Sequence, residues 1–148
     1  MKFFCDIMLG KLARYLRILR FDTRYEKIIS EVELVLTARR EDRIIITRKE
    51  RLTKEKGVIF LNTDSPEEQL KILNQTLNLK DRIKPFSRCL ICNEEIEEID
   101  KEEAKGKVPY FTFRTQKNFS QSPTCQRIYW EGSHLKKKCF LFTMGIEL

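Results

Sequence analysis

FFCDIMLGKLARYLRILR, at residues 3–20, is the stretch that decides the fold of this chain. It opens with a short apolar run that holds one carboxylate, Asp6, and turns at Gly10 into a segment whose apolar residues recur at helical spacing. A strand that ends in an acid and leads into a basic helix places a metal-binding group beside phosphate-binding groups, which suits phosphodiester chemistry. The alternative is a strand–helix unit in which Asp6 only caps the helix and the basic residues are solvated. These basic residues are Lys11, Arg14, Arg17 and Arg20.

The first half of the chain alternates between strand-like and helix-like segments. Short strands are predicted at residues 21–25, 44–47 and 58–61, and helices at residues 30–38, 49–56 and 67–77. Ser30 and Glu33 form a capping box at the start of the first of these helices. Strands and helices that alternate at this spacing predict an α/β fold, with a parallel sheet covered by helices on both faces.

Composition limits the class of protein. The 148 residues are 41% apolar, which is enough for a core, and the net charge of +7 favours an anionic partner such as nucleic acid. No apolar run is long enough for a membrane span, and the N-terminus lacks the cleavage site of a secretory signal. We therefore expect a soluble, cytoplasmic protein with no membrane partner. Five cysteines in such a chain favour thiols or metal ligands over disulfides, and Cys5 is expected to be a buried thiol.

A change of composition near residue 84 predicts two domains, at residues 1–83 and 84–148. The second has too little apolar surface for a core of its own, so we expect a small β-rich module held together by a metal. Its aromatic residues either form its core or stack on unpaired bases of RNA. These residues are Tyr110, Phe111, Phe113, Tyr129 and Trp130. Lys117 and the three lysines at residues 136–138 either contact phosphates or form a solvated charge run.

Three acids are expected to converge at one edge of the sheet, because ligands of open parallel sheets gather at the carboxyl ends of the strands. Asp6 and Asp64 follow predicted strands, and Glu31 begins a helix between them. Such a carboxylate cluster could hold Mg²⁺ or Mn²⁺, which would activate water for phosphodiester hydrolysis. The alternative is that Asp6 and Asp64 cap helices and Glu31 complements a helix dipole.

Five motifs together resemble the Mut-seven C-terminal RNase family, a PIN-like nuclease domain followed by a zinc ribbon. They are DxMLGKLARxLR at 6–17, ExELxxxA at 31–38, IIITR at 44–48, FSRCLxCN at 86–93 and RIYWxGSH at 127–134. The resemblance implies a metal-dependent endoribonuclease that uses Mg²⁺ or Mn²⁺ and acts on single-stranded or structured RNA. Whether a protein partner completes either site stays open. It implies Asp6, Glu31 and Asp64 as catalytic acids. The residues expected to bind RNA are Lys11, Arg14, Arg17, Arg48, Lys49 and Arg127.

Two positions depart from the family pattern. Lys49 stands where the family has an aspartate, and an ammonium there would neutralise the acids and compete with a divalent ion. A catalytically inactive RNA-binding or ribonucleoprotein module on the same scaffold is therefore the alternative function. Ser122 stands where the family has a cysteine. Zinc bound by Cys89, Cys92 and Cys125 would then need His134, Cys139 or a water as its fourth ligand, and the alternative is that these thiols are free.

Overall fold

A computed structural model of the protein describes residues 1–84 and 87–130. Its first part is built on a parallel sheet of four strands in the order β2-β1-β3-β4. The strands are β1 (Lys2–Cys5), β2 (Asp22–Tyr25), β3 (Ile44–Thr47) and β4 (Val58–Phe60). Each neighbouring pair is parallel, which confirms the sheet predicted from the alternating segments.

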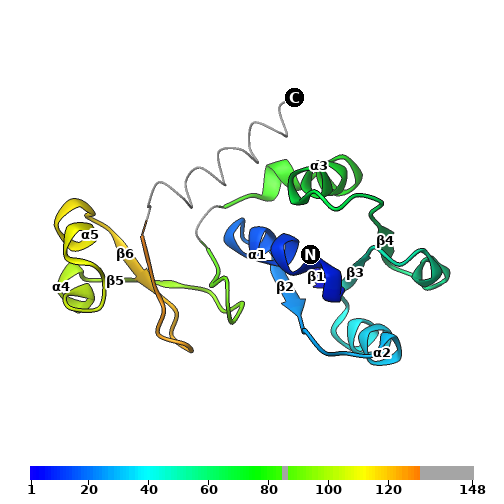
Figure 1. Ribbon diagram of the computed structural model, residues 1–148, viewed down its shortest axis with the longest axis horizontal. Coiled ribbons are helices and arrows are strands. Elements are labelled where there is room, and N and C mark those ends of the chain that lie inside the picture. Colours follow the sequence, from blue (N-terminus) through cyan, green and yellow to red (C-terminus); the bar gives the residue numbers. More distant parts are fainter. Residues whose placement is uncertain (85–86, 131–148) are drawn as a thin grey trace.

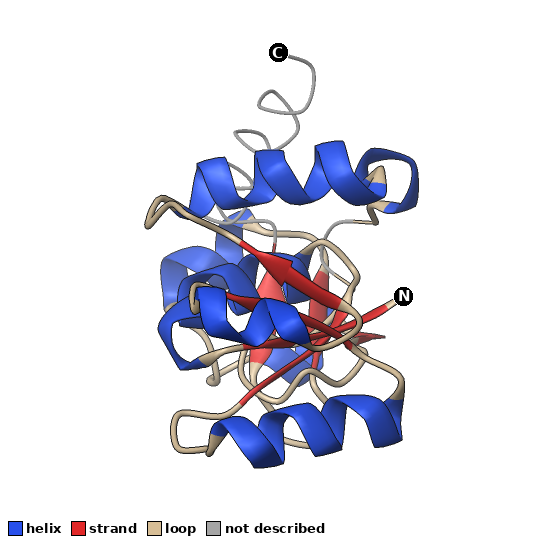
Figure 2. Ribbon diagram, turned by 90° about the vertical axis from the view of Figure 1, so that its right-hand side faces the viewer, coloured by secondary structure: helices blue, strands red, loops and turns tan. Residues whose placement is uncertain are grey.

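Helices cover both faces of this sheet. The helices are α1 (Gly10–Ile18), α2 (Glu31–Glu41) and α3 (Pro66–Leu77), with three short 3₁₀ helices, η1 (Ile7–Leu9), η2 (Glu50–Lys54) and η3 (Leu79–Arg82). One apolar cluster joins α1 and α3 to one face, and a second joins α2 and η2 to the other. Figure 2 shows the sheet between a helix above and a helix below. None of the helices in the described ranges is long and apolar enough to cross a bilayer, and the cytoplasmic location stays a prediction.

Side chains of adjacent residues in β1 enter opposite cores, as the period of a strand requires. Phe3 and Cys5 belong to the cluster beneath α1 and α3, whereas Phe4 packs with Leu34 and Ile45 beneath α2. Cys5 is fully buried, which confirms the expected core thiol, and this burial raises its pKa. The sheet therefore needs both helical layers, because both of its faces are apolar.

Local sequence sets where the helices begin. The Ser30 hydroxyl accepts a hydrogen bond from the Glu33 amide at 3.1 Å, which confirms the N-cap predicted for α2. Gly10 begins α1 where the Tyr25 ring comes close, since a Cβ added at Gly10 would lie 3.1 Å from the Tyr25 hydroxyl. That hydroxyl donates to the Ile7 carbonyl at 2.9 Å, so the absence of a side chain at Gly10 lets Tyr25 hold the turn between β1 and α1.

The second part is a small antiparallel sheet with two short helices (Figure 1). Its strands are β5 (Glu97–Ile99), β6 (Phe119–Gln121) and β7 (Ile128–Trp130), and its helices are α4 (Lys101–Ala104) and α5 (Tyr110–Thr115). Tyr129 is buried, as a core residue should be, but Tyr110 and Phe111 are 74% and 75% exposed. A core role is therefore wrong for Tyr110 and Phe111, because the helix that contains them turns both outward.

The two parts meet along the edge strand β2. Thr23 in this strand donates its amide hydrogen to Asn93 Oδ1 at 3.0 Å, and its carbonyl accepts from Arg17 Nε at 2.9 Å. The Asn93 amide group also donates to Asp22 Oδ1 at 2.6 Å. These side chains satisfy backbone groups that an edge strand would otherwise leave open. The predicted boundary between residues 83 and 84 stays a prediction, since residues 85–86 beside it lie outside the described ranges.

Candidate functional site

Asp6 is fixed in the turn that follows β1. Its carboxyl group is almost completely buried, and Oδ1 accepts a hydrogen bond from the Ile7 amide at 2.7 Å, which caps η1. Oδ2 accepts from the Thr47 hydroxyl at 2.8 Å, at the end of β3. The two alternatives for Asp6 are therefore compatible. Asp6 caps the helix η1, and it also lies at the carboxyl edge of the sheet, where a ligand could bind.

Lys49 brings Asp6 and Glu31 together. Its Nζ atom lies 3.7 Å from Asp6 Oδ2 and 3.3 Å from Glu31 Oε1. The backbone amide of Lys49 donates to the Thr47 hydroxyl at 2.9 Å, so the same threonine orients both the lysine and the buried acid. The ammonium thus occupies the space between two of the three predicted acids.

Arg51 is a member of this group that the sequence did not predict. Its guanidinium lies in η2 and forms a two-pronged ion pair with Glu31, with Nε 2.9 Å from Oε1 and 3.1 Å from Oε2. The hydrogen bond from Arg51, together with the charge of Lys49, lowers the pKa of Glu31. Glu31 is therefore ionised at neutral pH and already satisfied by two cations of its own chain.

Asp64 does not join the other two acids. It is exposed in the loop after β4, and the cap of α3 is instead Ser65, whose hydroxyl accepts from the Glu68 amide at 3.4 Å. Within the described ranges, the three acids do not form a group whose ligand atoms all lie within 4.8 Å of one another. Mg²⁺ requires several oxygen ligands in near-octahedral geometry. As placed here, the acids do not fit a divalent cation, because Lys49 and Arg51 neutralise Glu31 and Asp64 lies apart.

The predicted RNA-binding residues fall into two groups. Lys11, Arg14 and Arg127 are exposed, and none of the three makes an ion pair with a described residue. Arg48 is half-buried, and its Nε atom has no hydrogen-bond partner among the described residues. Lys11, Arg14 and Arg127 can therefore offer charge to an external anion, whereas the Nε atom of Arg48 is buried.

Arg17 is placed differently, in the interior. It is buried, and besides the Thr23 carbonyl it donates to the carbonyls of Leu90 at 2.7 Å and Ile91 at 3.2 Å. Burial lowers its pKa, so this guanidinium is held by backbone dipoles rather than by water. Arg17 thus links the sheet to the second part instead of facing solvent where a phosphate could reach it.

A groove lies where the two parts face each other, with a volume of about 870 Å³. Arg20, Lys84 and Arg88 line it together with Trp130, and Glu95 and Glu98 give it mixed charge. Three of the residues that line this groove have a predicted part in RNA binding: Arg20 as a phosphate-binding residue, and Tyr129 and Trp130 with base stacking as one alternative. Arg20 is one of the basic residues expected at the first helix, whereas no binding role was predicted for Lys84 or Arg88.

Two backbone knuckles face each other in the second part. In the first, the Cys89 amide donates to the Glu94 carbonyl at 2.9 Å, and the Asn93 amide donates to the Cys89 carbonyl at 3.1 Å. The second repeats this pattern from Ser122: its amide donates to Arg127 at 2.9 Å, and Gln126 donates back to Ser122 at 3.0 Å. The residue after each second ligand position has a positive φ, 67° at Asn93 and 65° at Gln126. The second knuckle therefore keeps the ligand-presenting backbone of the first.

Three cysteines converge between these knuckles. The Sγ atoms of Cys89, Cys92 and Cys125 all lie within 4.8 Å of one another, a spacing that suits thiolates bound to one zinc ion at about 2.3 Å. Burial opposes ionisation of Cys89, but hydrogen bonds from the Tyr129 hydroxyl and from backbone amides lower its pKa to about 6. Burial raises the pKa of Cys92. The three cysteines could hold a metal ion, compatible with zinc.

Ser122 takes the place of a fourth thiol. Its hydroxyl is fully buried, lies 3.1 Å from Cys92 Sγ and accepts a hydrogen bond from the Cys125 amide at 3.3 Å. A neutral hydroxyl is not a usual zinc ligand, and structural zinc sites almost always have four protein ligands. His134 and Cys139, the protein ligands considered for the fourth position, lie outside the described residues.

Comparisons with known proteins point to one family. No curated protein and no solved structure gives a significant match to the chain. A family model described as the Mut7-C RNAse domain matches residues 1–140 of the 148-residue chain. The matched range includes the sheet with Asp6 and Lys49 as well as both knuckles with their three cysteines. The chain therefore belongs to the Mut7-C RNAse domain family.

Proposed function

We propose that the chain acts on RNA as a ribonuclease of PIN-like fold, and that Lys49 weakens its hydrolytic activity. The observation that carries this proposal is the meeting of Asp6, Glu31 and Lys49 beside the carboxyl ends of β1 and β3. That edge of an open parallel sheet is where ligands bind. The family match supports a nuclease-type function for the same range of residues.

The proposed roles follow from the positions of the side chains. Asp6 and Glu31 are the proposed catalytic acids, and Asp64, which lies apart from them in the loop after β4, is proposed only as a supporting acid. Lys11 and Arg14 lie at the start of α1, which follows directly from Asp6 through η1, and so can contact the phosphates on either side of a bound nucleotide. Arg48, which is half-buried, is a further proposed phosphate contact. Arg127 belongs to the same proposed set in the second part.

The weakness of the proposed activity comes from charge. Hydrolysis by a PIN-like site would draw on Mg²⁺ or Mn²⁺ held by carboxylates, and here two carboxylates are paired with ammonium and guanidinium groups. The natural chain is therefore expected to cleave RNA slowly. Zinc between the two knuckles has a separate proposed role, which is to hold the second part in shape.

Lys49 also favours a second candidate function, which is RNA binding without cleavage. A fixed ammonium at the carboxyl edge supplies the positive charge that a phosphate needs without any bound ion. On this alternative the acids serve only to orient Lys49. RNA is the ligand in both cases, and the two functions differ in whether the backbone is cut.

Cleavage of single-stranded RNA in Mn²⁺ separates them. The natural chain is compared with Asp6→Asn and Lys49→Asp, and with Lys54→Asp as a control that changes the same charge on an exposed lysine of η2. We expect slow cleavage by the natural chain, a loss of about 100-fold or more in Asp6→Asn, and a gain in Lys49→Asp alone. Cleavage confined to Lys49→Asp would establish the binding function instead. A natural chain that neither binds nor cuts RNA would refute the proposal.

A further inference from the structure

Helix α5 exposes two adjacent aromatic side chains. Tyr110 is 74% exposed and Phe111 is 75% exposed, at the outer end of the second part. Exposing large apolar side chains to water has an unfavourable free energy. Adjacent exposed apolar side chains therefore indicate a surface that binds a ligand or a partner. The third aromatic of this segment, Phe113, is half-buried, so α5 is anchored on one side and leaves the other two rings free.

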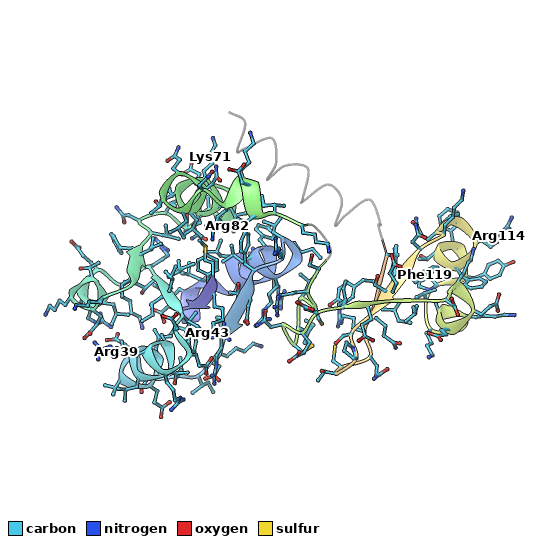
Figure 3. The ribbon with its side chains drawn as sticks, turned by 180° about the vertical axis from the view of Figure 1, so that it is seen from behind. Arg39, Arg43, Lys71, Arg82, Arg114 and Phe119 are labelled. Carbon is cyan, nitrogen blue, oxygen red and sulfur yellow. The ribbon has the colours of Figure 1, made fainter. Side chains whose placement is uncertain are left out.

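Two aromatic rings of α5 are each contacted by a cation. The Arg114 guanidinium lies over the Tyr110 ring at 6.0 Å from its centroid, and the Lys101 ammonium lies over Phe113 at 4.9 Å. Figure 3 shows Arg114 at the outer end of the second part. From residue 104 to residue 130 the chain has five basic residues and no aspartate or glutamate, whereas the preceding residues 94–103 carry seven acids and one lysine. The basic residues are Lys105, Lys107, Arg114, Lys117 and Arg127, of which all are exposed.

Exposed rings beside exposed cations fit one class of ligand well. Unpaired bases stack on aromatic rings, and their phosphates are bound by nearby lysines and arginines. Double-stranded RNA keeps its bases stacked on each other and offers no free base face. The core of a protein interface is depleted of lysine and glutamate, whereas here the two rings stand beside charged side chains.

We propose that Tyr110 and Phe111 stack on unpaired bases of single-stranded RNA while Arg114 and Lys117 bind its phosphates. This site assumes that RNA is the ligand, as proposed above for the chain as a whole. Figure 1 places α5 and α2, the helix that begins with Glu31, at opposite ends of the molecule. The α5 site therefore binds RNA at a distance from the acids. Only a long single strand can contact both sites at once, so long strands are expected to bind better than short ones.

Binding of a fluorescein-labelled oligouridylate tests the site, measured by fluorescence anisotropy over a series of salt concentrations. Each of Tyr110→Ala and Phe111→Ala is expected to weaken binding about tenfold, with little change in the salt dependence. Arg114→Gln and Lys117→Gln should each make the salt dependence shallower by roughly the contribution of one phosphate contact. Tyr110→Phe and Phe111→Tyr keep the stacking surface, so both should bind nearly as well as the natural chain.

Three controls make the result specific. Ile28→Ala with Leu36→Ala removes exposed apolar surface from the first part and should leave the affinity unchanged. Trp130 fluorescence and the Tm show whether a variant has kept its fold, since Trp130 packs on the buried Phe119. A matching RNA duplex should show no difference between the natural chain and the alanine variants.

Three outcomes would overturn the site. If the natural chain binds the oligouridylate and the folded alanine variants bind it equally well, α5 is not an RNA site, while the proposed function stands. If the alanine variants alter self-association in sedimentation and not RNA affinity, the surface is a protein interface. If the natural chain binds no RNA at all, the proposed function fails first and the α5 site fails with it.

Discussion

The ammonium of Lys49 lies 3.7 Å from the buried Oδ2 atom of Asp6. This is the position at which a divalent ion would meet the first acid of a carboxylate site, and the lysine fills it with a fixed positive charge. The same ammonium reaches Glu31 at 3.3 Å, so both acids are neutralised from within the chain.

Mn²⁺ should therefore bind the natural chain only weakly and barely change its Tm. Lys49→Asp removes the ammonium and adds an acid, so Mn²⁺ at about ten times its Kd is expected to raise the Tm of this variant by roughly 4 °C. Differential scanning fluorimetry with and without Mn²⁺ measures the Tm of the natural chain and of Lys49→Asp. Lys54→Asp is the matched control and should behave like the natural chain. A Mn²⁺-dependent rise of similar size in the natural chain would show that Lys49 does not exclude the ion.

The ion pair between Asp22 and Arg43 should make stability depend on pH. Partial burial opposes ionisation of Asp22. The hydrogen bonds from Arg43 and Asn93 together outweigh this effect, so the pKa of Asp22 is lowered. A carboxyl whose pKa is lower in the folded than in the unfolded chain contributes stability above about pH 4, and this contribution is lost as the pH falls through the folded value.

Asp22→Asn should accordingly reduce the free energy of unfolding by about 1 kcal/mol at pH 7 and flatten its fall in acid. Urea unfolding at a series of pH values checks both effects. Asp42→Asn removes an exposed carboxyl that makes no ion pair with a described residue, and it should follow the curve of the natural chain. Curves for Asp22→Asn and the natural chain that stay parallel in acid would contradict the role given to Asp22.

Arg17 should matter for stability far more than its neighbour on the same helix. Arg17→Met leaves the carbonyls of Thr23, Leu90 and Ile91 without their donor, and the expected loss is about 3 kcal/mol of unfolding free energy. Arg14→Met alters an exposed residue of α1 and should cost less than about 0.5 kcal/mol. Urea unfolding followed by far-UV circular dichroism gives both values. Equal losses in the two variants would mean that the link through Arg17 contributes little.

The parallel sheet was predictable because its signals are local. The apolar runs at residues 44–47 and 58–61 are short and β-branched, as buried parallel strands are, and turn residues separate them from helical segments. Once the strands are parallel, their carboxyl ends share one edge, so the meeting of Asp6 with the residues after β3 follows from topology. Sequence and topology together are therefore enough to place Lys49 at this edge.

Arg51 and Arg17 could not be assigned in the same way. The pairing of Arg51 with Glu31 depends on how η2 packs beside the start of α2, and no spacing rule connects residues in separate elements. Arg17 did leave a signal, since it follows Ala13 by four residues and so lies on the buried stripe of α1. A basic residue on an apolar stripe is more often a buried link than a surface contact.

The second part was harder to predict because its segments are short. Aromatic residues such as Tyr110, Phe111 and Phe113 are common in strands and suited the predicted β-rich module, yet these residues fold as helix α5 directly after Pro109. Residues that follow one another in a helix turn by about 100°, so Tyr110 and Phe111 cannot both face the sheet. The knuckle at Cys89 and Cys92 was predictable because its ligand spacing is fixed by geometry.

Ser122→Cys should complete the cysteine cluster. The knuckle that contains Ser122 already has the hydrogen bonds and the positive φ of its partner, so a thiol at this position would reach the other three without rebuilding the backbone. A fourth thiolate is expected to raise zinc affinity about 100-fold. Competition with a chromophoric chelator measures the affinity, and the visible absorption of the Co²⁺ form reports the number of thiolates.

Thr76→Cys adds one thiol on the exposed face of α3, far from the knuckles, and serves as the control for thiol count. It should bind zinc as the natural chain does. If Ser122→Cys gives the zinc affinity and Co²⁺ spectrum of the natural chain, the fourth coordination position must already be filled by another group, and Ser122 is then a packing residue. If instead the gain is confined to Ser122→Cys, the natural site is a three-thiolate site whose serine keeps it from closing.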